Sequence, residues 1–268
     1  MNDRTYTALV LAATRGNRDP LAEKGGVSHK AFIDLAGVPM LRRVVEAVAQ
    51  SNRVGKILIA IEDWAEDEAR ALLRGVAGED MLVFVGSHES IGASVSAIAA
   101  QFPDALPLVI TTGDNGLHNA EVVKYFCDEL DKVEGDAAIG LTNARYLLEK
   151  YPEEKRAFHR FADGEFSSCN LYALMTREAF SAAKIFDGGG QFGKKPKRLI
   201  GAFGLLAFLA YKSRLFKLRQ FLGVLSRLLK LKTVPVELPF AEGPIDIDRM
   251  QDWEMAERIL RERGTDKP

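Results

Sequence analysis

The sequence has few residues of the kinds that cross-link a chain or bind zinc. It contains two cysteines, Cys127 and Cys169, and four histidines among 268 residues. The cysteines are far apart in the chain, form no CxxC pair and have no histidine pair near them, which excludes a disulfide framework and a zinc-finger-type site. We therefore expect two reduced, partly buried thiols, as in a cytoplasmic protein.

Long hydrophobic runs are absent as well. The apolar run Ala8–Ala13 is followed almost at once by Arg15, so it is too short for the core of a secretory signal. Residues 199–211 carry no charge, but they too fall short of the ~18 apolar residues that a spanning helix needs. A hydrophobic content of 47% and a charged content of 27% are ordinary for globular proteins. We predict one domain over residues 1–268 and a cytoplasmic location.

Short apolar runs alternate with longer segments of helical periodicity. Strands are expected at 6–12, 56–61, 81–85, 108–112, 137–142, 170–175 and 234–238, and helices at 39–50, 64–74, 91–101, 120–130, 177–183 and 250–263. Near-continuous apolar strands that alternate with helices predict an α/β fold whose mostly parallel sheet is covered on both faces. Ligands of such folds bind beyond the carboxyl ends of the strands, so the loops 14–30, 86–92 and 113–119 are the candidate binding loops. The polar stretch 143–168 is expected to be an irregular excursion, either over the active face or as a solvated loop with a short helix.

The loop after the first strand combines small residues with cations. It contains Thr14, Gly16 and Arg18 and ends at Lys30. Backbone N–H groups of such a loop can turn inward, and its cationic side chains supply positive charge, so a phosphate site is one interpretation. An ordinary solvated turn is the other.

Carboxylates occur near two further turns of the chain. Asp114 follows the buried strand 108–112 and Gly113, while Asp246 and Asp248 lie near the C-terminal end. Alternation in an extended segment puts Asp246 and Asp248 on the same side. Each acid alone is an unremarkable turn or cap residue, but carboxylates that meet a phosphate loop are what Mg²⁺ with a nucleoside triphosphate needs.

Several of these segments resemble a known family. Leu11–Arg18 resembles the signature L-A-A-G-x-G-x-R, with Thr14 at its first glycine, and Lys30 with the following residues to Met40 resembles K-x-L…G-x-P-M. Ser90–Val95 is similar to the family's base-contacting loop, Gly113-Asp114 to its G-D motif, and Asp246–Asp252 to its D-x-D-T-P-x-D ending. The chain thereby resembles the MobA-like NTP transferases, which include molybdenum-cofactor guanylyl- and cytidylyltransferases and several CTP-using enzymes.

The resemblance implies a Rossmann-like, GT-A-like nucleotidyltransferase fold with a mixed, mostly parallel sheet flanked by helices. It also implies Mg²⁺-dependent transfer of NMP from a nucleoside triphosphate, with CTP or GTP favoured, to a phosphorylated small-molecule or lipid-like acceptor, with release of pyrophosphate. No nucleic acid partner is expected. An acceptor phosphate is already anionic, so the lack of an obvious catalytic His or Cys fits this chemistry.

Site residues follow from the matched motif positions. Arg18 and Lys30 would steady the triphosphate as catalytic cations, and Asp114 and Asp248, with Asp246, would hold the metal. The residues expected to contact the nucleotide are Leu11, Ala12, Ala13, Thr14, Gly16, Ser87, Gly92, Ser94, Thr112 and Gly113. The acceptor would be bound by Asn170, Asn143 and Arg145. The chain departs from the family at Thr14, whose hydroxyl could donate a hydrogen bond to phosphate in place of the glycine backbone, and at Arg249-Met250, which replaces Thr-Pro.

Residues 193–232 form a basic segment outside the family pattern. They include eleven Lys or Arg and no Asp or Glu, and Leu215, Leu218, Leu222, Leu225 and Leu229 recur at helical spacing. We expect a basic amphipathic helical insertion. It could pack on the core or form a homodimer through 199–232, lie on an anionic membrane at the inner face, or act as a lid over a substrate.

Two other functions remain open. A nucleotide-sugar glycosyltransferase of related fold would want a D-x-D sequence after the middle strand, where residues 112–116 offer only Asp114. A nucleotide-binding, membrane-associated regulatory protein without catalytic activity is suggested by Thr14.

Overall fold

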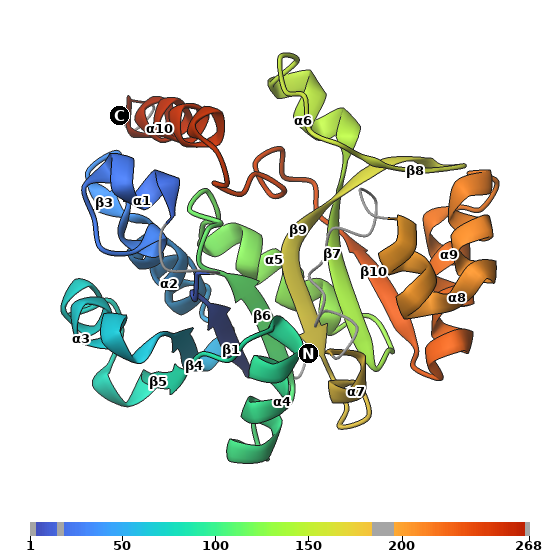
Figure 1. The fold of residues 1–268 in the computed structure, drawn as a ribbon, viewed down its shortest axis with the longest axis horizontal. Coiled ribbons are helices and arrows are strands. Elements are labelled where there is room, and N and C mark those ends of the chain that lie inside the picture. Colours follow the sequence, from blue (N-terminus) through green and yellow to red (C-terminus); the bar gives the residue numbers. More distant parts are fainter. Residues whose placement is uncertain (1–3, 15–18, 184–195, 266–268) are drawn as a thin grey trace. The chain divides into compact units, whose positions relative to one another are not determined.

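The computed structural model describes residues 4–14, 19–183 and 196–265. The chain divides into two compact units (Figure 1). The first comprises Met1–Ser87, Ile110–Cys127 and Glu242–Pro268, and the second His88–Val109 and Asp128–Ala241. The single-domain organisation stays a prediction.

Parallel strands form the centre of the first unit. β1 (Tyr6–Leu11) pairs in parallel with β4 (Val54–Ile61), which pairs in parallel with β5 (Leu82–Gly86), and β6 (Leu108–Thr112) is the other neighbour of β1. The side chains from Ile57 to Ile61 are all buried, on both faces of the sheet. Strands buried in this way need helices on each face.

The helices and short elements of this unit cover the sheet and shape its loops. They are α1 (Pro20–Gly25), η1 (Lys30–Phe32), β2 (Asp34–Leu35), β3 (Val38–Pro39), α2 (Met40–Gln50), α3 (Asp63–Leu72), η2 (Glu79–Met81), α5 (Ala120–Leu130) and α10 (Met250–Thr265). α1 is well bounded locally, because Asp19 caps its N-terminus, Pro20 begins it and Gly26 ends it at φ 66°. The sequence did not predict this helix, since six residues carry little periodicity.

The second unit has strands of both directions. β7 (Ala137–Asn143) pairs in parallel with β10 (Thr233–Glu237) and antiparallel with β9 (Gly164–Leu174), which also pairs with β8 (His159–Phe161). Its helices are α4 (Ile91–Gln101), α6 (Ala144–Lys150), α7 (Phe180–Ala183), α8 (Pro196–Ser213) and α9 (Leu218–Leu229). The predicted class, a mixed and mostly parallel sheet flanked by helices, is confirmed.

The stretch 143–168 contains the short helix that one interpretation expected, but the prediction of an otherwise irregular segment was wrong. It contains α6, β8 and the first residues of β9, and β8 and β9 form a hairpin through Gly164 at φ 140°. β9 therefore begins at Gly164, six residues before the strand expected from Asn170. Its polar start escaped the apolar pattern because only some of its side chains are buried.

The leucine stripe of the basic segment faces the interior of the second unit. Leu218, Leu222 and Leu225 of α9 are buried with Leu141 and Phe166 in one hydrophobic cluster. These three leucines are therefore covered by the core, as expected for a helical insertion that packs on it, and a membrane contact of the segment 193–232 stays a prediction. Leu215 departs from the stripe, because it precedes α9 and is 79% exposed. No helix in the described part of the chain is both long and apolar enough to cross a membrane.

Candidate active site

Three charged side chains from distant parts of the sequence meet in the first unit. The Lys30 ammonium, on η1, donates to Asp114 Oδ2 at 3.2 Å and to Asp248 Oδ1 at 2.8 Å. Lys30 is largely buried, with 15% of its side chain exposed, whereas Asp248 is 55% exposed. Burial disfavours the charge on Lys30, but the two carboxylates outweigh that effect and raise the pKa of its ammonium. Lys30 is therefore charged throughout the neutral range.

The end of β6 positions Asp114. Thr112 Oγ1 donates to Asp114 Oδ1 at 2.5 Å, and Asn115 Nδ2 donates to Thr112 Oγ1 at 2.5 Å. Between them, the Gly113 N–H donates to the Leu11 carbonyl at 2.8 Å. A Cβ at Gly113 would lie 3.0 Å from the Ala12 Cα, so only glycine lets β1 and the Asp114 turn approach this closely.

The segment before α10 positions Asp248. The N–H of Ile247 donates to the Asp114 carbonyl at 3.0 Å, which holds the two carboxylate-bearing segments together. The buried Asp252 carboxylate accepts from the N–H groups of Asp248 and Arg249, at 3.3 and 2.8 Å. The last acid of the D-x-D…D pattern is thus a helix-capping residue that fixes the backbone of Asp248.

A buried histidine also anchors this segment. His118 Nε2 donates to the Gly243 carbonyl at 2.8 Å. Burial lowers the pKa of His118 to about 4, an effect that outweighs the favourable hydrogen bond to Gly243. His118 is therefore neutral at physiological pH, which supports a structural role.

One carboxylate joins the two ends of the loop 14–30. Glu62 Oε1 accepts from the N–H and the hydroxyl of Thr14, at 2.8 and 3.1 Å, and its Oε2 lies 3.0 Å from His29 Nε2. His29 Nδ1 accepts from the Ala31 N–H at 3.0 Å, so Nε2 carries the proton and donates to Glu62. Glu62 thus holds Thr14 at one end of the loop and, through His29, the start of η1 at the other.

These contacts change the interpretation of two residues. The Thr14 hydroxyl, expected to donate to a phosphate, donates to Glu62 instead. His29 is buried, and burial lowers its pKa despite the neighbouring Glu62. Its role is therefore to hold the start of η1 through its two hydrogen bonds, and not to supply a positive charge. Sequence reasoning missed Glu62, although the residue follows a predicted strand end, the position where ligand-binding loops begin.

The structure places the other predicted residues of this unit around the ends of its strands. Arg18 and Gly16 lie outside the described residues. Leu11 ends β1, Ala12 after it is buried, and Ala13 is exposed. The Ser87 N–H donates to the Ile61 carbonyl at 3.1 Å, just beyond β5. Asp246 is half-buried, and of the two C-terminal acids it is Asp248 that contacts Lys30.

The remaining predicted residues belong to the second unit. Gly92 and Ser94 lie in the first turn of α4, where Ser94 Oγ accepts from the His88 N–H at 3.2 Å. Asn143 caps α6 through the Arg145 N–H, and the exposed Arg145 guanidinium stacks on Tyr146. Asn170 lies within β9 rather than at its start, at φ 50° in an irregularity of the β7–β9 register. Left-handed backbone at a non-glycine residue inside a strand often marks a functional position.

The charges around Lys30 fit a magnesium site in their chemistry. In the described ranges, no group of three or more His, Cys, Asp or Glu side chains converges on one point. Two carboxylates do converge, and the Lys30 ammonium lies between them. Mg²⁺ in nucleotide sites takes one or two carboxylates and completes its shell with water and phosphate oxygens, so this donor set suffices.

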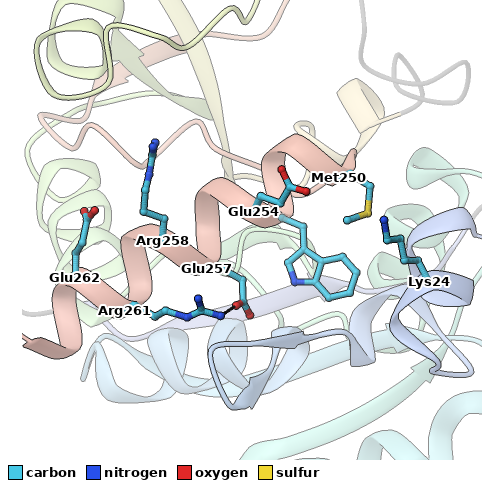
Figure 2. Close-up of a pocket in the computed structure, with 8 residues that line it drawn as sticks. Lys24, Met250, Glu254, Glu257, Arg258, Arg261 and Glu262 are labelled. Carbon is cyan, nitrogen blue, oxygen red and sulfur yellow. Dashed lines mark hydrogen bonds and ion pairs between the residues drawn. The ribbon is translucent and has the colours of Figure 1, made fainter.

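A shallow hollow along α10 lies outside this constellation. It has a volume of about 640 Å³ and is lined by Lys24, Met250, Trp253, Glu254, Glu257, Arg258, Arg261 and Glu262. Figure 2 shows Lys24 on a separate element, α1, and the other labelled side chains along α10, with Arg261 paired to Glu257. Paired charges at helical spacing are ordinary for a solvated helix surface, so we assign no function to this hollow.

Comparison with known families gives one match across most of the chain. The model of the MobA-like NTP transferase domain matches residues 8–223. The match includes Thr14, Lys30 and Asp114, and it ends before Asp248.

Curated relatives match parts of the chain. The 2-C-methyl-D-erythritol 4-phosphate cytidylyltransferase of Nocardia farcinica is 40% identical over 105 residues, which are 39% of this chain and 42% of the relative. The bifunctional protein GlmU of Rhizorhabdus wittichii is 28% identical over 141 residues, 53% of this chain and 29% of that protein. The chain therefore aligns with less than half the length of these relatives.

Solved structures resemble the whole chain in fold. A hypothetical transferase from Thermus thermophilus has a TM-score of 0.73 at 20% identity and covers 93% of this chain and 99% of its own. CMP:2-keto-3-deoxy-manno-octonic acid synthetase, solved with CTP, has a TM-score of 0.61 at 14% identity, with 97% and 99% covered. At these identities the likeness concerns the fold alone.

Proposed function

This chain belongs to the MobA-like NTP transferase family, and from that premise we propose that it is a Mg²⁺-dependent nucleotidyltransferase. It transfers NMP from a nucleoside triphosphate to a phosphorylated small-molecule or lipid-like acceptor and releases pyrophosphate. CTP is the favoured donor, with GTP second, because several of the curated relatives are named as cytidylyltransferases. The observation that carries the proposal is the meeting of Lys30, Asp114 and Asp248 at the carboxyl end of β6.

Lys30 supplies fixed positive charge in this mechanism. The two carboxylates keep its ammonium protonated, and its burial limits the competition from water. When a triphosphate binds, the ammonium can exchange a carboxylate for phosphate oxygens and neutralise the charge that develops on the leaving pyrophosphate. Electrostatic stabilisation of this kind, together with positioning, provides most of the catalysis in phosphoryl-type transfers.

Asp114 and Asp248 would hold Mg²⁺. Bound there, the ion would neutralise phosphate charge and orient the triphosphate for in-line attack. The chain's part is to hold both carboxylates in place, through the Thr112 hydroxyl for Asp114 and the Asp252 cap for Asp248. The Ile247–Asp114 backbone hydrogen bond keeps the two segments in register.

The attacking group needs no general base in this proposal. An acceptor phosphate is anionic near neutral pH and attacks as it is. The state of the two histidines beside the motifs is consistent with the absence of a general base. His29 and His118 both have lowered pKa values, and both make fixed hydrogen bonds. Asn143, Arg145 and Asn170 remain our candidates for binding the acceptor.

The test is pyrophosphate release by the purified chain. Each of the four NTPs is supplied with Mg²⁺ and a panel of sugar and polyol phosphates, and the product is identified by ³¹P NMR as a new diphosphate linkage. We expect release with CTP or GTP, and a loss of about 100-fold or more in kcat for Asp114→Asn and for Asp248→Asn. Asp67→Asn, an exposed change on α3, is the matched control and should retain full activity.

The other functions predict different results. A product that carries a sugar in place of a nucleotide would indicate the glycosyltransferase. Tight nucleotide binding without turnover of any mixture would indicate the regulatory protein. Near-normal activity of both aspartate variants, with the fold intact by circular dichroism, would overturn the metal assignment.

A further inference from the structure

The basic segment has an apolar surface that the sequence did not locate correctly. Gly204, at φ 81° and ψ 171°, interrupts α8, and beyond it Leu205, Leu206 and Leu209 are 59%, 73% and 52% exposed. Between them Ala207 is fully buried in the cluster of the second unit. We call the exposed leucines Leu205, Leu206 and Leu209 the α8 leucine face.

The exposed leucines form a face rather than scattered positions. Leu205 and Leu209 are four residues apart and Leu206 and Leu209 three, so all three lie on one side of the helix. The opposite side packs inward through Ala207, with Ala210 and Tyr211 partly buried. Leu215 follows in the connection to α9 and is itself 79% exposed. The leucines of this face belong to α8, which Figure 1 shows in orange beside α9.

The inward side of α8 is held firmly. The Tyr211 hydroxyl lies 2.8 Å from His159 Nδ1, and its ring packs on Phe161 and Phe221. The Asp163 carboxylate accepts from the Leu218 N–H at 2.9 Å and so fixes the start of α9 to the β8–β9 hairpin. The orientation of α8 is therefore determined by its own packing, and its leucines face outward without rearrangement of the helix.

Cationic side chains follow this face in the sequence. Lys212, Arg214, Lys217 and Arg219 are all exposed, and they lie between the last turn of α8 and the first turn of α9. Arg227, Lys230 and Lys232 continue the series along α9 and past its end. The segment 193–232 contains no acidic residue at all. Exposed leucines in a segment whose charges are all positive match a surface that is hydrocarbon inside and anionic at its boundary.

We propose that the α8 leucine face docks on an anionic membrane surface, with the leucines inserted at the acyl boundary and the basic residues among the lipid phosphates. A second copy of the chain fits less well, because a two-fold contact would bring one basic segment against another. The docking does not depend on the proposed nucleotidyl transfer, although it would bring the enzyme to a lipid-like acceptor.

The experiment is flotation of the purified full chain with vesicles. One set contains phosphatidylcholine alone and the other contains 30% phosphatidylglycerol. We expect the chain to float with the anionic set at low salt. It should be released at 0.5 M NaCl, because salt screens the attraction between the basic residues and the lipid phosphates. Failure to float with anionic vesicles at low salt would overturn the proposal.

Variants separate the leucines from the charges. The triple change L206S/L209S/L215S should lower the partition coefficient by roughly a hundred-fold, because each exposed leucine contributes to insertion. The quadruple change K212Q/R214Q/K217Q/R219Q should lower it by a similar factor. The charge-matched control K24Q/K56Q/R74Q/K155Q removes four exposed bases elsewhere in the chain and should float normally.

Two readouts keep the outcome decisive. Sedimentation equilibrium without vesicles detects any dimer. If the unmodified chain dimerises but does not float, and L206S/L209S/L215S dissociates that dimer, the membrane assignment would be overturned in favour of a homodimer. Pyrophosphate release by the variants in solution should be unchanged. That result distinguishes a failure of docking from a failure of the proposed enzymatic activity.

Discussion

Glu62 provides the sharpest test of how the site is organised. Its carboxylate accepts three hydrogen bonds, two from Thr14 and one from His29. The change Glu62→Gln keeps the size of the side chain but replaces one acceptor oxygen with an NH₂ group. We expect this small change to loosen both ends of the loop 14–30.

The magnitude follows from the donors that face Glu62. Whichever way the new side-chain amide turns, its NH₂ meets either the Thr14 donors or the Nε2–H of His29. His29 cannot reverse its tautomer to accept without losing the Ala31 N–H on Nδ1. At least one hydrogen bond to a charged group is therefore lost and one donor is left unsatisfied, a cost of about 2 kcal/mol. For a chain of this size that lowers Tm by about 5 °C.

Activity should respond in a characteristic way. Glu62 touches no reacting group in our proposal and positions Thr14 and Lys30, so the KM for the nucleotide should rise by roughly ten-fold while kcat changes less. Steady-state kinetics and calorimetric unfolding measure the two effects. The control is Glu66→Gln on α3, whose carboxylate pairs with Arg70 on the helix surface and contributes only about 0.5 kcal/mol. A Glu62→Gln protein with unchanged KM and Tm would refute the proposed link between the two loop ends.

Two further predictions concern the segments that carry the aspartates. Because the pKa of buried His118 is about 4, below its unfolded value of about 6.5, the unfolded state binds the extra proton and stability falls as pH drops through this window. The free energy of unfolding should decrease by roughly 3 kcal/mol between pH 7 and pH 4 from this group, with nearby Arg263 and Asp114 acting in opposite directions. Urea unfolding of His118→Gln, which can still donate to Gly243, should show a shallower pH dependence, and an equal slope would contradict the assignment. Gly113→Ala should lower stability by about 1–3 kcal/mol and reduce kcat, because its methyl would crowd the Ala12 backbone and displace Asp114. Gly78→Ala, where nothing lies within 4 Å of the new methyl, is its control, and equal effects of the two changes would rule out crowding as the cause.

Much of the fold was readable from the sequence because its central strands are nearly continuous apolar runs. β1, β4, β5 and β6 were placed within one or two residues of their observed bounds. The errors lie where side chains alternate or where the pattern is short, as in α1 and the polar start of β9. Such segments are stabilised by caps, turns and neighbouring strands rather than by their own periodicity.

The sequence by itself determined which residue types follow the strand ends, and these led to Lys30, Asp114 and Asp248. A strand that ends in glycine and an acid, or an extended segment with alternating acids, is a local pattern and needs no tertiary information. Only the tertiary structure decided that one lysine lies between the two carboxylates, because residues 30, 114 and 248 are far apart in the chain. It likewise decided that Glu62 binds both ends of the loop, and that α9 buries its leucines while α8 exposes its own. Helical periodicity shows that a face is apolar, but only the packing of neighbouring elements decides whether that face is covered.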